Sequence, residues 1–525
     1  MEMNKDMGLN AWLSRQLLLG EILARYTRKY PDNEMIIFGE HRIRYQEMND
    51  RVNSLANIFI AKGIKRGDKI GALMQNRQEL LEIFFAAAKI GAVNVPINIR
   101  IAPREMAYIL NNADVKLLCL EDHLVPQIEQ VRGELPQIGD YVVVGKSDAT
   151  GYQPYETIMS AGSTESPEVW LQDDDDAFII YTSGTTGKPK GAVLTHKSLV
   201  THAMNLCYEN TLSRPRRPDL PDISQKGLSI APLFHVGGLM SAIRMMLDLL
   251  PLVVINFSPL EFLKTVEKEK ITFAFLVPAM WRLVLDHPDL KKYDVSSLRV
   301  AAYAADITPN SLKERILEAF PNAGLSEAFG QTEMSATTVT MKHQDAMRKE
   351  GSVGLPMRSV DIRVVDDSMN DVPRGQVGEI VYRGPGMMKG YYKNPEATRE
   401  AFSGGWFHSG DLVRQDEEGF VFIVDRKKDM IKSGGENIYS AEVEAVLQSH
   451  PAIKEVAVVG IPDPKWGEVV KAYVGLYPGQ HVTSEELIAF CGEHLAKFKR
   501  PKIVEFAEAL PRSATGKILK KDLRG

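Results

Sequence analysis

The sequence predicts a layered α/β fold, in which a large N-terminal domain of α/β subdomains with mainly parallel sheets precedes a small α+β C-terminal domain. Short apolar strands alternate with helical patterns over most of the chain, which is typical of parallel sheets buried on both faces. The length of 525 residues is also too great for one core, because domains usually contain about 100 to 200 residues. We expect residues 1–425 to form the first domain and residues 426–525 the second.

The N-terminal pattern begins with a strand at residues 69–74, an amphipathic helix at 79–90 and a second strand at 92–97. An acidic run at 173–176 is interpreted as a polar connector before a buried strand. Further strands, most of them separated by helical patterns, are expected at residues 115–120, 177–181, 226–230, 252–255, 271–276 and 297–302.

The C-terminal pattern follows a stretch rich in glycine and the charged sequence DRKKD at 425–429. This charged sequence is either a hinge between domains or a solvated turn. The segment beyond it has the mixed pattern of a separate small α+β domain. Its expected elements are a helix at 441–449, strands at 455–459 and 469–476, a helix at 484–495 and a strand at 502–506.

The composition is that of a soluble globular protein, with 44% hydrophobic and 25% charged residues. The formal charge of −5 is small for this length and predicts no bulk affinity for nucleic acid. Only three cysteines occur, without the spacing of a zinc site, which fits a reducing cytoplasm. The N-terminus lacks a signal-type apolar core, and charges interrupt the most apolar stretch, 239–257, so we expect no membrane span.

The stretch YTSGTTGKPKGA, at residues 181–192, directly follows the apolar run 177–180. Its glycines let backbone N–H groups point inward, its hydroxyls add donors and its lysines add positive charge, so it suits phosphate oxygens. It is not a P-loop, because Gly184 and Gly187 stand too close together and Pro189 follows Lys188. The alternative is a mobile surface loop, but ligands favour the ends of buried strands in α/β sheets.

Five further stretches follow in order: PLFHVGG at 232–238, AFGQTE at 328–333, WFHSGD at 406–411, DRKKDMIKSGGENIYSAEVE at 425–444 and PRSATGKILK at 511–520. Together with the glycine-rich loop, they resemble the signature motifs of the adenylate-forming superfamily. That superfamily includes acyl-CoA synthetases, adenylation domains of peptide synthetases and beetle luciferases. One such motif is a weak signal, whereas six in the expected order are specific.

The resemblance implies an acid–thiol ligase that works in two steps. A carboxylate attacks the α-phosphate of ATP and releases pyrophosphate, and the thiol of coenzyme A then displaces AMP from the acyl-adenylate. ATP, Mg²⁺ and coenzyme A are therefore the implied cofactors and co-substrate, and a small carboxylic acid is the other partner. The C-terminal third, with DPKWGE at 463–468 and KFKRPK at 497–502, most resembles bacterial fatty-acyl-CoA synthetases, so we expect a medium- or long-chain fatty acid. An aryl or cinnamic-type acid, a carrier protein as acceptor, and luciferase-type oxidation remain open as alternatives.

The resemblance also implies the nucleotide-binding residues. Glu333 matches the metal-associated glutamate, Thr332 beside it binds phosphate, and Phe329 stacks on adenine next to Gly330. The phosphate loop is implied to contribute Thr182, Ser183, Gly184, Thr185, Thr186, Gly187 and Lys190, and the ribose and its phosphate are implied to meet Asp411 and Arg426. Outside the motif, each of these residues would have an ordinary structural interpretation, such as a turn or core packing.

Three predictions concern a mobile C-terminal domain. Lys517 matches the lysine that bridges the substrate carboxylate and the α-phosphate. The domain is implied to rotate about a hinge at Lys428, which withdraws Lys517 and presents Gly434 and Gly435 to the thiol. Glycines suit this place because they let a slim pantetheine arm approach the backbone.

The acid is implied to bind against His235, Val277, Tyr303, Ala304 and Ala328. His235 either orients the carboxylate or is a core histidine. Tyr303 and Ala304 stand where many relatives carry adjacent glycines, so the tyrosine either shortens the pocket or stacks on an aromatic acid. The basic, proline-rich segment at 213–222 is a lid, a contact for anionic lipid or simply mobile, and a homodimer is left open.

Overall fold

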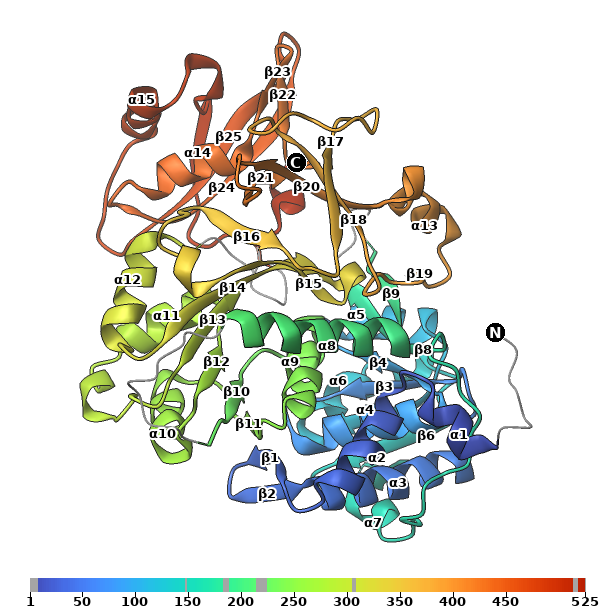
Figure 1. Ribbon diagram of the computed structural model, residues 1–525. Helices are drawn as coiled ribbons and strands as arrows, with labels where there is room; N and C mark the ends of the chain where they lie inside the picture. The colour runs from blue at the N-terminus through green and yellow to red at the C-terminus, as the bar shows by residue number, and fades with distance from the viewer. Residues whose placement is uncertain are drawn as a thin grey trace. The chain divides into compact units, whose positions relative to one another are not determined.

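Figure 1 shows the computed structural model of the chain, which describes residues 8–146, 149–182, 188–213, 224–304, 308–512 and 518–524. The chain divides into two compact units. The first comprises residues up to 361 together with 383–407, and the second comprises 362–382 together with the residues from 408 onward. Among the described residues, no helix combines the length and the apolar character that crossing a bilayer requires.

One sheet of the first unit has eight strands in the order β19-β9-β8-β4-β3-β5-β6-β7. All neighbours from β8 to β7 run parallel, and the β8–β9 and β9–β19 pairs are antiparallel. The strands are β3 (Lys69–Leu73), β4 (Val93–Pro96), β5 (Val115–Glu121), β6 (Asp140–Val144), β7 (Tyr152–Pro154), β8 (Asp176–Thr182), β9 (Lys190–Thr195) and β19 (Gly390–Tyr391). This parallel core confirms the layered α/β prediction.

A second sheet of this unit runs in the order β16-β15-β14-β13-β12-β10-β11-β1-β2, with parallel pairing from β14 to β1. Its strands are β1 (Glu34–Phe38), β2 (His41–Arg44), β10 (Gly227–Ser229), β11 (Leu252–Val254), β12 (Phe273–Phe275), β13 (Val300–Ala304), β14 (Gly324–Gln331), β15 (Ala336–Met341) and β16 (Ser352–Pro356). Strand β13 begins later than the predicted 297, because the Leu298 N–H closes a turn onto the Val295 carbonyl at 3.2 Å.

Helices cover these sheets, and α8 and α9 lie side by side in Figure 1. Every residue of α4 from Leu80 onward is buried, which explains why that helix is apolar almost all round. The helices of the first unit are α1 (Leu9–Ser14), α2 (Leu19–Lys29), α3 (Tyr45–Ala61), α4 (Gln78–Ile90), α5 (Pro103–Asn112), α6 (Val125–Glu129), α7 (Tyr155–Met159), α8 (His196–Ser213), α9 (Val236–Leu247), α10 (Pro259–Glu269), α11 (Pro278–Leu285), α12 (Asn310–Ala319) and α13 (Pro395–Ala401).

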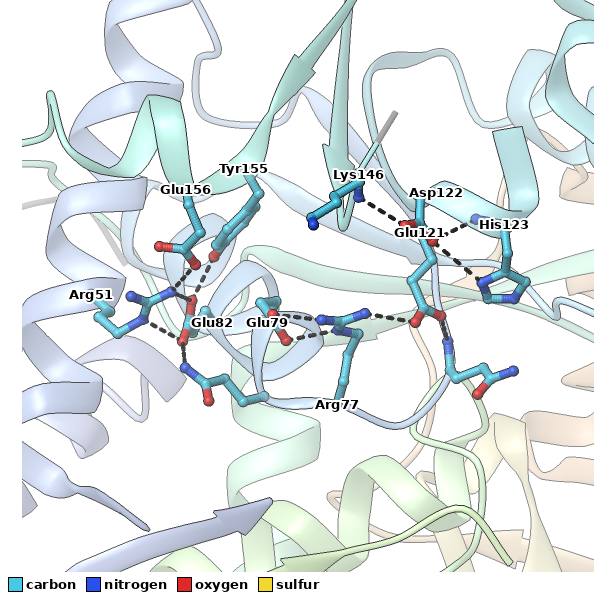
Figure 2. A network of polar contacts seen from close by, with 12 residues as sticks. Arg51, Arg77, Glu79, Glu82, Glu121, Asp122, His123, Lys146, Tyr155 and Glu156 are labelled. Carbon is cyan, nitrogen blue, oxygen red and sulfur yellow. Dashed lines mark hydrogen bonds and ion pairs between the residues drawn. The ribbon is translucent and has the colours of Figure 1, made fainter. Parts of the chain in front are cut away.

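A buried carboxylate joins three of these helices, as Figure 2 shows. The fully buried Glu82 of α4 accepts hydrogen bonds from Arg51 of α3 at 2.7 and 3.0 Å, from Tyr155 of α7 at 2.6 Å and from Gln78 at 2.8 Å. Burial and the neighbouring Glu82 raise the pKa of Tyr155 well above its ordinary value, so its hydroxyl remains a donor. A buried charge is tolerated only when it is paired and hydrogen-bonded, and this network meets that requirement while it links the three helices.

The second unit contains two sheets. One runs β17-β18-β20-β21, with β17 (Asp361–Val365), β18 (Gly378–Arg383), β20 (Phe407–Gln415) and β21 (Val421–Arg426). The other runs β23-β22-β25-β24, with β26 beside β25, and it packs against α14 and α15. Its elements are β22 (Ile431–Ser433), β23 (Glu436–Ile438), α14 (Ser440–Gln448), β24 (Ile453–Asp463), β25 (Gly467–Leu476), α15 (Ser484–His494) and β26 (Ile503–Phe506), which confirms the small α+β C-terminal domain.

A local signal explains where helix α15 begins. Helix α15 starts at Ser484 because Thr483 and Glu486 form a capping box, with each side chain accepting the other's backbone N–H.

The compact second unit includes residues before the expected division at 425/426. That division, like the hinge at Lys428, stays a prediction.

Candidate active site

The ends of the glycine-rich loop lie in the β8–β9 hairpin. Thr182, the last residue of β8, is the register partner of Lys190, the first residue of β9, and its hydroxyl donates to the Lys190 carbonyl at 3.4 Å. The ammonium of Lys188 lies 5.5 Å from the centre of the Tyr108 ring. The five predicted phosphate-binding residues between these ends, Ser183, Gly184, Thr185, Thr186 and Gly187, lie outside the described residues.

The GQTE motif occupies the end of β14 and a short 3₁₀ turn, η5 (Thr332–Met334). Phe329, Gly330 and Thr332 are all partly exposed there, whereas Glu333 is only 8% exposed. A side chain at position 330 would come within 1.9 Å of the Ala336 carbonyl oxygen, so only glycine fits this turn. The tight turn fixes the backbone that carries the predicted metal-associated carboxylate.

Tyr391 connects the loop with the GQTE turn. Its strand β19 pairs with β9, and the centre of its ring lies 5.3 Å from the Lys190 ammonium. Its hydroxyl donates to Glu333 Oε1 at 2.9 Å. The structure therefore brings Lys190 and Glu333, two residues predicted separately, to one tyrosine, the first to its ring and the second to its hydroxyl. Sequence reasoning missed Tyr391, because no quoted motif contains it.

In the second unit, Asp411 of β20 and Arg426 of β21 are register partners and form an ion pair of 2.7 Å. Asp411 is 3% exposed, and its backbone N–H donates to the Ser409 hydroxyl at 2.9 Å. The two residues predicted to meet the ribose and its phosphate are thus brought together.

Glu379 forms hydrogen bonds with residues close to Asp411 and Arg426, and sequence reasoning missed it too. The buried carboxylate accepts from the Gly410 N–H at 3.0 Å and contacts His408 Nδ1 at 3.1 Å and Lys427 Nζ at 3.0 Å. Burial by itself raises the pKa of Glu379, but the hydrogen bonds from His408, Lys427 and Gly410 hold it below its ordinary value. The ionised carboxylate therefore holds His408 and Gly410, which precede Asp411, and Lys427, which follows Arg426.

Of the four residues predicted to act through movement of the C-terminal domain, the structure describes three. Gly434 and Gly435 are exposed in the turn between β22 and β23 and have φ angles of 61° and 87°, which favour glycine. Lys428 is exposed in the turn after β21. Lys517 lies outside the described residues, although Arg512 and Ile518, on either side of its segment, form a β-bridge.

The PLFHVGG motif leads into the first turn of α9, and Asn76 holds its N-terminal part in place. The Asn76 amide donates to the Ala231 carbonyl at 3.0 Å and its oxygen accepts the Leu233 N–H at 2.7 Å. His235 is partly exposed at the start of α9, with its ring centre 5.3 Å from that of Phe234. Val277, partly exposed, precedes α11.

The remaining pocket residues divide between the faces of the sheet. Ala304 and Ala328 are register partners and are both partly exposed, whereas the neighbouring pair, Tyr303 and Glu327, is buried. Successive side chains of a strand point to opposite faces, so Tyr303 does not share a face with Ala304. In the described part of the chain, the Tyr303 hydroxyl has no hydrogen-bond partner. A role for Tyr303 in the pocket stays a prediction, and it cannot come from the face that carries the two alanines.

Magnesium fits the donor at Glu333. Only Oε1 of this carboxylate has a hydrogen-bond partner among the described residues, which leaves Oε2 as a hard oxygen donor of the kind that Mg²⁺ takes. No group of three or more His, Cys, Asp or Glu side chains in the described ranges forms a metal site made wholly of protein ligands.

Comparison with known proteins places these features in one family. A model of AMP-binding enzymes matches residues 23–392, and a model of the C-terminal domain of AMP-binding enzymes matches residues 442–517. A feruloyl-CoA synthase from an Amycolatopsis species is 36% identical over 511 residues, covering 96% of this chain and 98% of the relative. A long-chain-fatty-acid–CoA ligase from Mycobacterium tuberculosis is 35% identical over 484 residues, covering 92% of this chain and 93% of the relative.

A solved structure of another CoA ligase resembles this fold. The structure of o-succinylbenzoate CoA synthetase from Bacillus subtilis, in complex with ATP and a magnesium ion, matches with a TM-score of 0.83. It is 28% identical and covers 96% of this chain and 98% of that one.

Proposed function

The chain belongs to the AMP-binding enzyme family and is an AMP-forming acid–CoA ligase, and we propose that its acid is a medium- or long-chain fatty acid. The placement of Tyr303 carries this proposal. The ring is fully buried, and strand alternation turns it away from the face on which Ala304 and Ala328 are accessible. The tyrosine therefore takes no space beside the small side chains of Ala304 and Ala328, which supports room for an extended apolar chain. The likeness to a fatty-acid–CoA ligase supports the same acid.

An aryl or cinnamic-type acid is the second candidate. The observation in its favour is the equally extensive likeness to a feruloyl-CoA synthase. Both candidates share the same chemistry at the carboxylate. They differ only in the acid's tail, which would lie beside Ala304, Ala328 and Val277.

In the proposed first step, the acid's carboxylate approaches the α-phosphate of ATP, so like charges must be brought together. At an effective dielectric of about 20, each unit-charge pair at 4 Å contributes roughly 4 kcal/mol, and several positive groups must therefore converge there. Lys190 binds the phosphates from β9, and Lys517 bridges the carboxylate and the α-phosphate. Magnesium, when bound, neutralises phosphate charge, and Glu333 Oε2 is the oxygen that would hold it.

The residues that match the family's nucleotide motifs are proposed to hold the nucleoside. Phe329 stacks on the adenine beside Gly330, and Thr332 donates to phosphate. Asp411 accepts hydrogen bonds from the ribose hydroxyls, and Arg426 turns its planar guanidinium toward ribose and phosphate oxygens. His235 orients the carboxylate of the acid.

The proposed second step needs the pantetheine thiol to reach the acyl-adenylate. Rotation about Lys428 withdraws Lys517 and presents the turn that contains Gly434 and Gly435. Both glycines have positive φ angles and exposed backbones, which supports a close approach by the pantetheine arm. ATP, Mg²⁺ and coenzyme A are thus the co-substrates and cofactor of the proposed reaction.

A panel of acids tests the proposal. Release of AMP is measured with ATP, Mg²⁺ and coenzyme A for acetate, for saturated acids from 6 to about 18 carbons, and for cinnamic, ferulic and benzoic acids. The highest kcat/KM with a saturated acid of eight or more carbons supports the fatty-acid proposal, and preference for cinnamic or ferulic acid replaces it with the second candidate. A parallel assay with a phosphopantetheinyl carrier protein as acceptor distinguishes carrier loading, and oxygen uptake distinguishes luciferase-type oxidation.

Three wider expectations stay predictions. These are a cytoplasmic location, a homodimer and a peripheral membrane contact. The basic segment at 213–222 that suggested the membrane contact lies almost wholly outside the described residues.

A further inference from the structure

Residues 386–391 form three hydrogen bonds with the GQTE turn and the serine that follows it. The Ser335 hydroxyl donates to the Gly386 carbonyl at 2.7 Å, and the Met388 N–H donates to the Glu333 carbonyl at 2.7 Å. The Tyr391 hydroxyl completes the set by donating to Glu333 Oε1 at 2.9 Å. The first two contacts fix the backbone of the turn, and only the third fixes the carboxylate itself.

Tyr391 is itself rigidly placed. Tyr391 is the register partner of Ala192 in β9, and its backbone N–H donates to the Thr398 hydroxyl at 2.9 Å. The adjacent Tyr392 N–H donates to the Gly191 carbonyl at 2.8 Å. These backbone contacts hold the tyrosine in place, and its hydroxyl donates to Glu333 Oε1.

The ring of Tyr391 has a second contact. The Lys190 ammonium lies 5.3 Å from the ring centre, within the range of a cation–π interaction. Lys190 and Glu333 form no direct ion pair in the described part of the chain. The tyrosine thus contacts each charged group while leaving the ammonium and Glu333 Oε2 available to a ligand.

We propose that Tyr391 is a positioning residue for ATP and its metal: its hydroxyl orients Glu333 so that Oε2 meets magnesium, and its ring holds Lys190 for phosphate. Tyr391 touches neither ligand and acts only through these two side chains. The inference rests on the proposed function, because it needs nucleotide to bind between Lys190 and Glu333.

Two substitutions separate the role of the Tyr391 hydroxyl from that of its ring. Tyr391→Phe removes the hydroxyl but keeps the ring, and Tyr391→Leu removes both. The matched control is Tyr392→Phe, because the Tyr392 hydroxyl also donates to a carboxylate, that of Asp114, at 2.9 Å. This control removes an equivalent hydrogen bond from the next residue without touching Glu333.

The measurement is calorimetric binding of ATP to the full chain without any acid, once with magnesium and once with a chelator. Hydrogen bonds to charged groups are typically worth a factor of roughly 10 to 100. Magnesium should increase the affinity of the wild-type chain for ATP. We expect Tyr391→Phe to reduce this increase by about tenfold and to leave the affinity for ATP in the presence of chelator unchanged. Tyr391→Leu is expected to weaken ATP binding in the presence of chelator as well, because Lys190 loses its contact with the aromatic ring.

Two results would overturn the inference. One is an unchanged magnesium gain in Tyr391→Phe, and the other is an equal loss in Tyr392→Phe, which would indicate general loosening of the segment. Failure of the proposed function looks different: the wild-type chain would bind Mg–ATP yet release no AMP with any acid of the panel.

Discussion

Arg426 Nε lies 2.7 Å from Asp411 Oδ1, and the two residues face each other as register partners across β20 and β21. The carboxylate is nearly buried, whereas 42% of the arginine side chain remains exposed. The pair therefore presents a fixed hydrogen-bond acceptor beside an accessible donor. A carboxylate acceptor suits ribose hydroxyls, and a guanidinium donor suits phosphate oxygens.

Asp411→Asn is expected to weaken ATP binding by roughly 10- to 100-fold, because an amide cannot accept from both ribose hydroxyls and no longer pairs with Arg426. Calorimetry with ATP measures the effect. The control is Asp371→Asn, which breaks another arginine–aspartate pair of 2.7 Å, with Arg363, on the same unit. Unchanged affinity in Asp411→Asn would remove this residue from the nucleotide site.

Much of the fold could be predicted because its signals are local. The strand at 69–74, the helix at 79–90 and the C-terminal helix at 484–495 match β3, α4 and α15 closely. Apolar runs and helical periodicity report burial directly, and the Thr483–Glu486 capping box marks a helix start within four residues.

The site was only partly predictable, because some of its contacts join distant segments. Tyr391 reaches Lys190 through the pairing of β19 with β9, which connects residues about two hundred positions apart, and no local pattern indicates that pairing. Tyr303 illustrates a different limit. Its face depends on the parity of the residue within β13, and a one-residue shift of register would turn the ring to the other side.

Lys517→Ala is expected to reduce ATP–pyrophosphate exchange by on the order of 10²- to 10³-fold, because one preorganised positive group is lost where charge develops. Thiolysis of a supplied acyl-adenylate should continue, since Lys517 is withdrawn in the second step. Lys521→Ala, which removes an exposed lysine of the same segment, is the control and should retain exchange. Equal losses in both half-reactions would contradict the role assigned to Lys517.

Lys428→Pro is expected to block the thioester-forming step while leaving adenylate formation largely intact. Proline fixes φ near −65° and would prevent the dihedral change that domain rotation needs. Single-turnover assays of the two half-reactions measure the difference. Lys428→Ala is the control, because alanine removes the side chain and keeps the backbone free. Normal thioester turnover in the proline variant would place the hinge elsewhere.

The buried Glu327 predicts a pH dependence of stability. Burial raises the pKa of Glu327 to about 7 from its ordinary value of 4.5, and the charge of Lys313 only partly opposes this. The folded state therefore holds a proton that the unfolded state loses at lower pH. The stabilisation is complete below about pH 4.5, falls as pH rises and is lost above about pH 7, with a maximum of roughly 3 kcal/mol.

Glu327→Gln removes this dependence, because the amide does not titrate and is nearly the same size. The stability of the variant relative to wild type should therefore increase between pH 5 and pH 8, as measured by urea midpoints at each pH. Glu350→Gln, at an exposed position, is the control and should change little over that range. A relative stability of Glu327→Gln that is flat or decreases with pH would mean that Glu327 is already ionised in the folded protein at pH 5. The physical reason for the expected rise is that wild type must bury a carboxylate charge above pH 7 or unfold, whereas the variant has no such charge to bury.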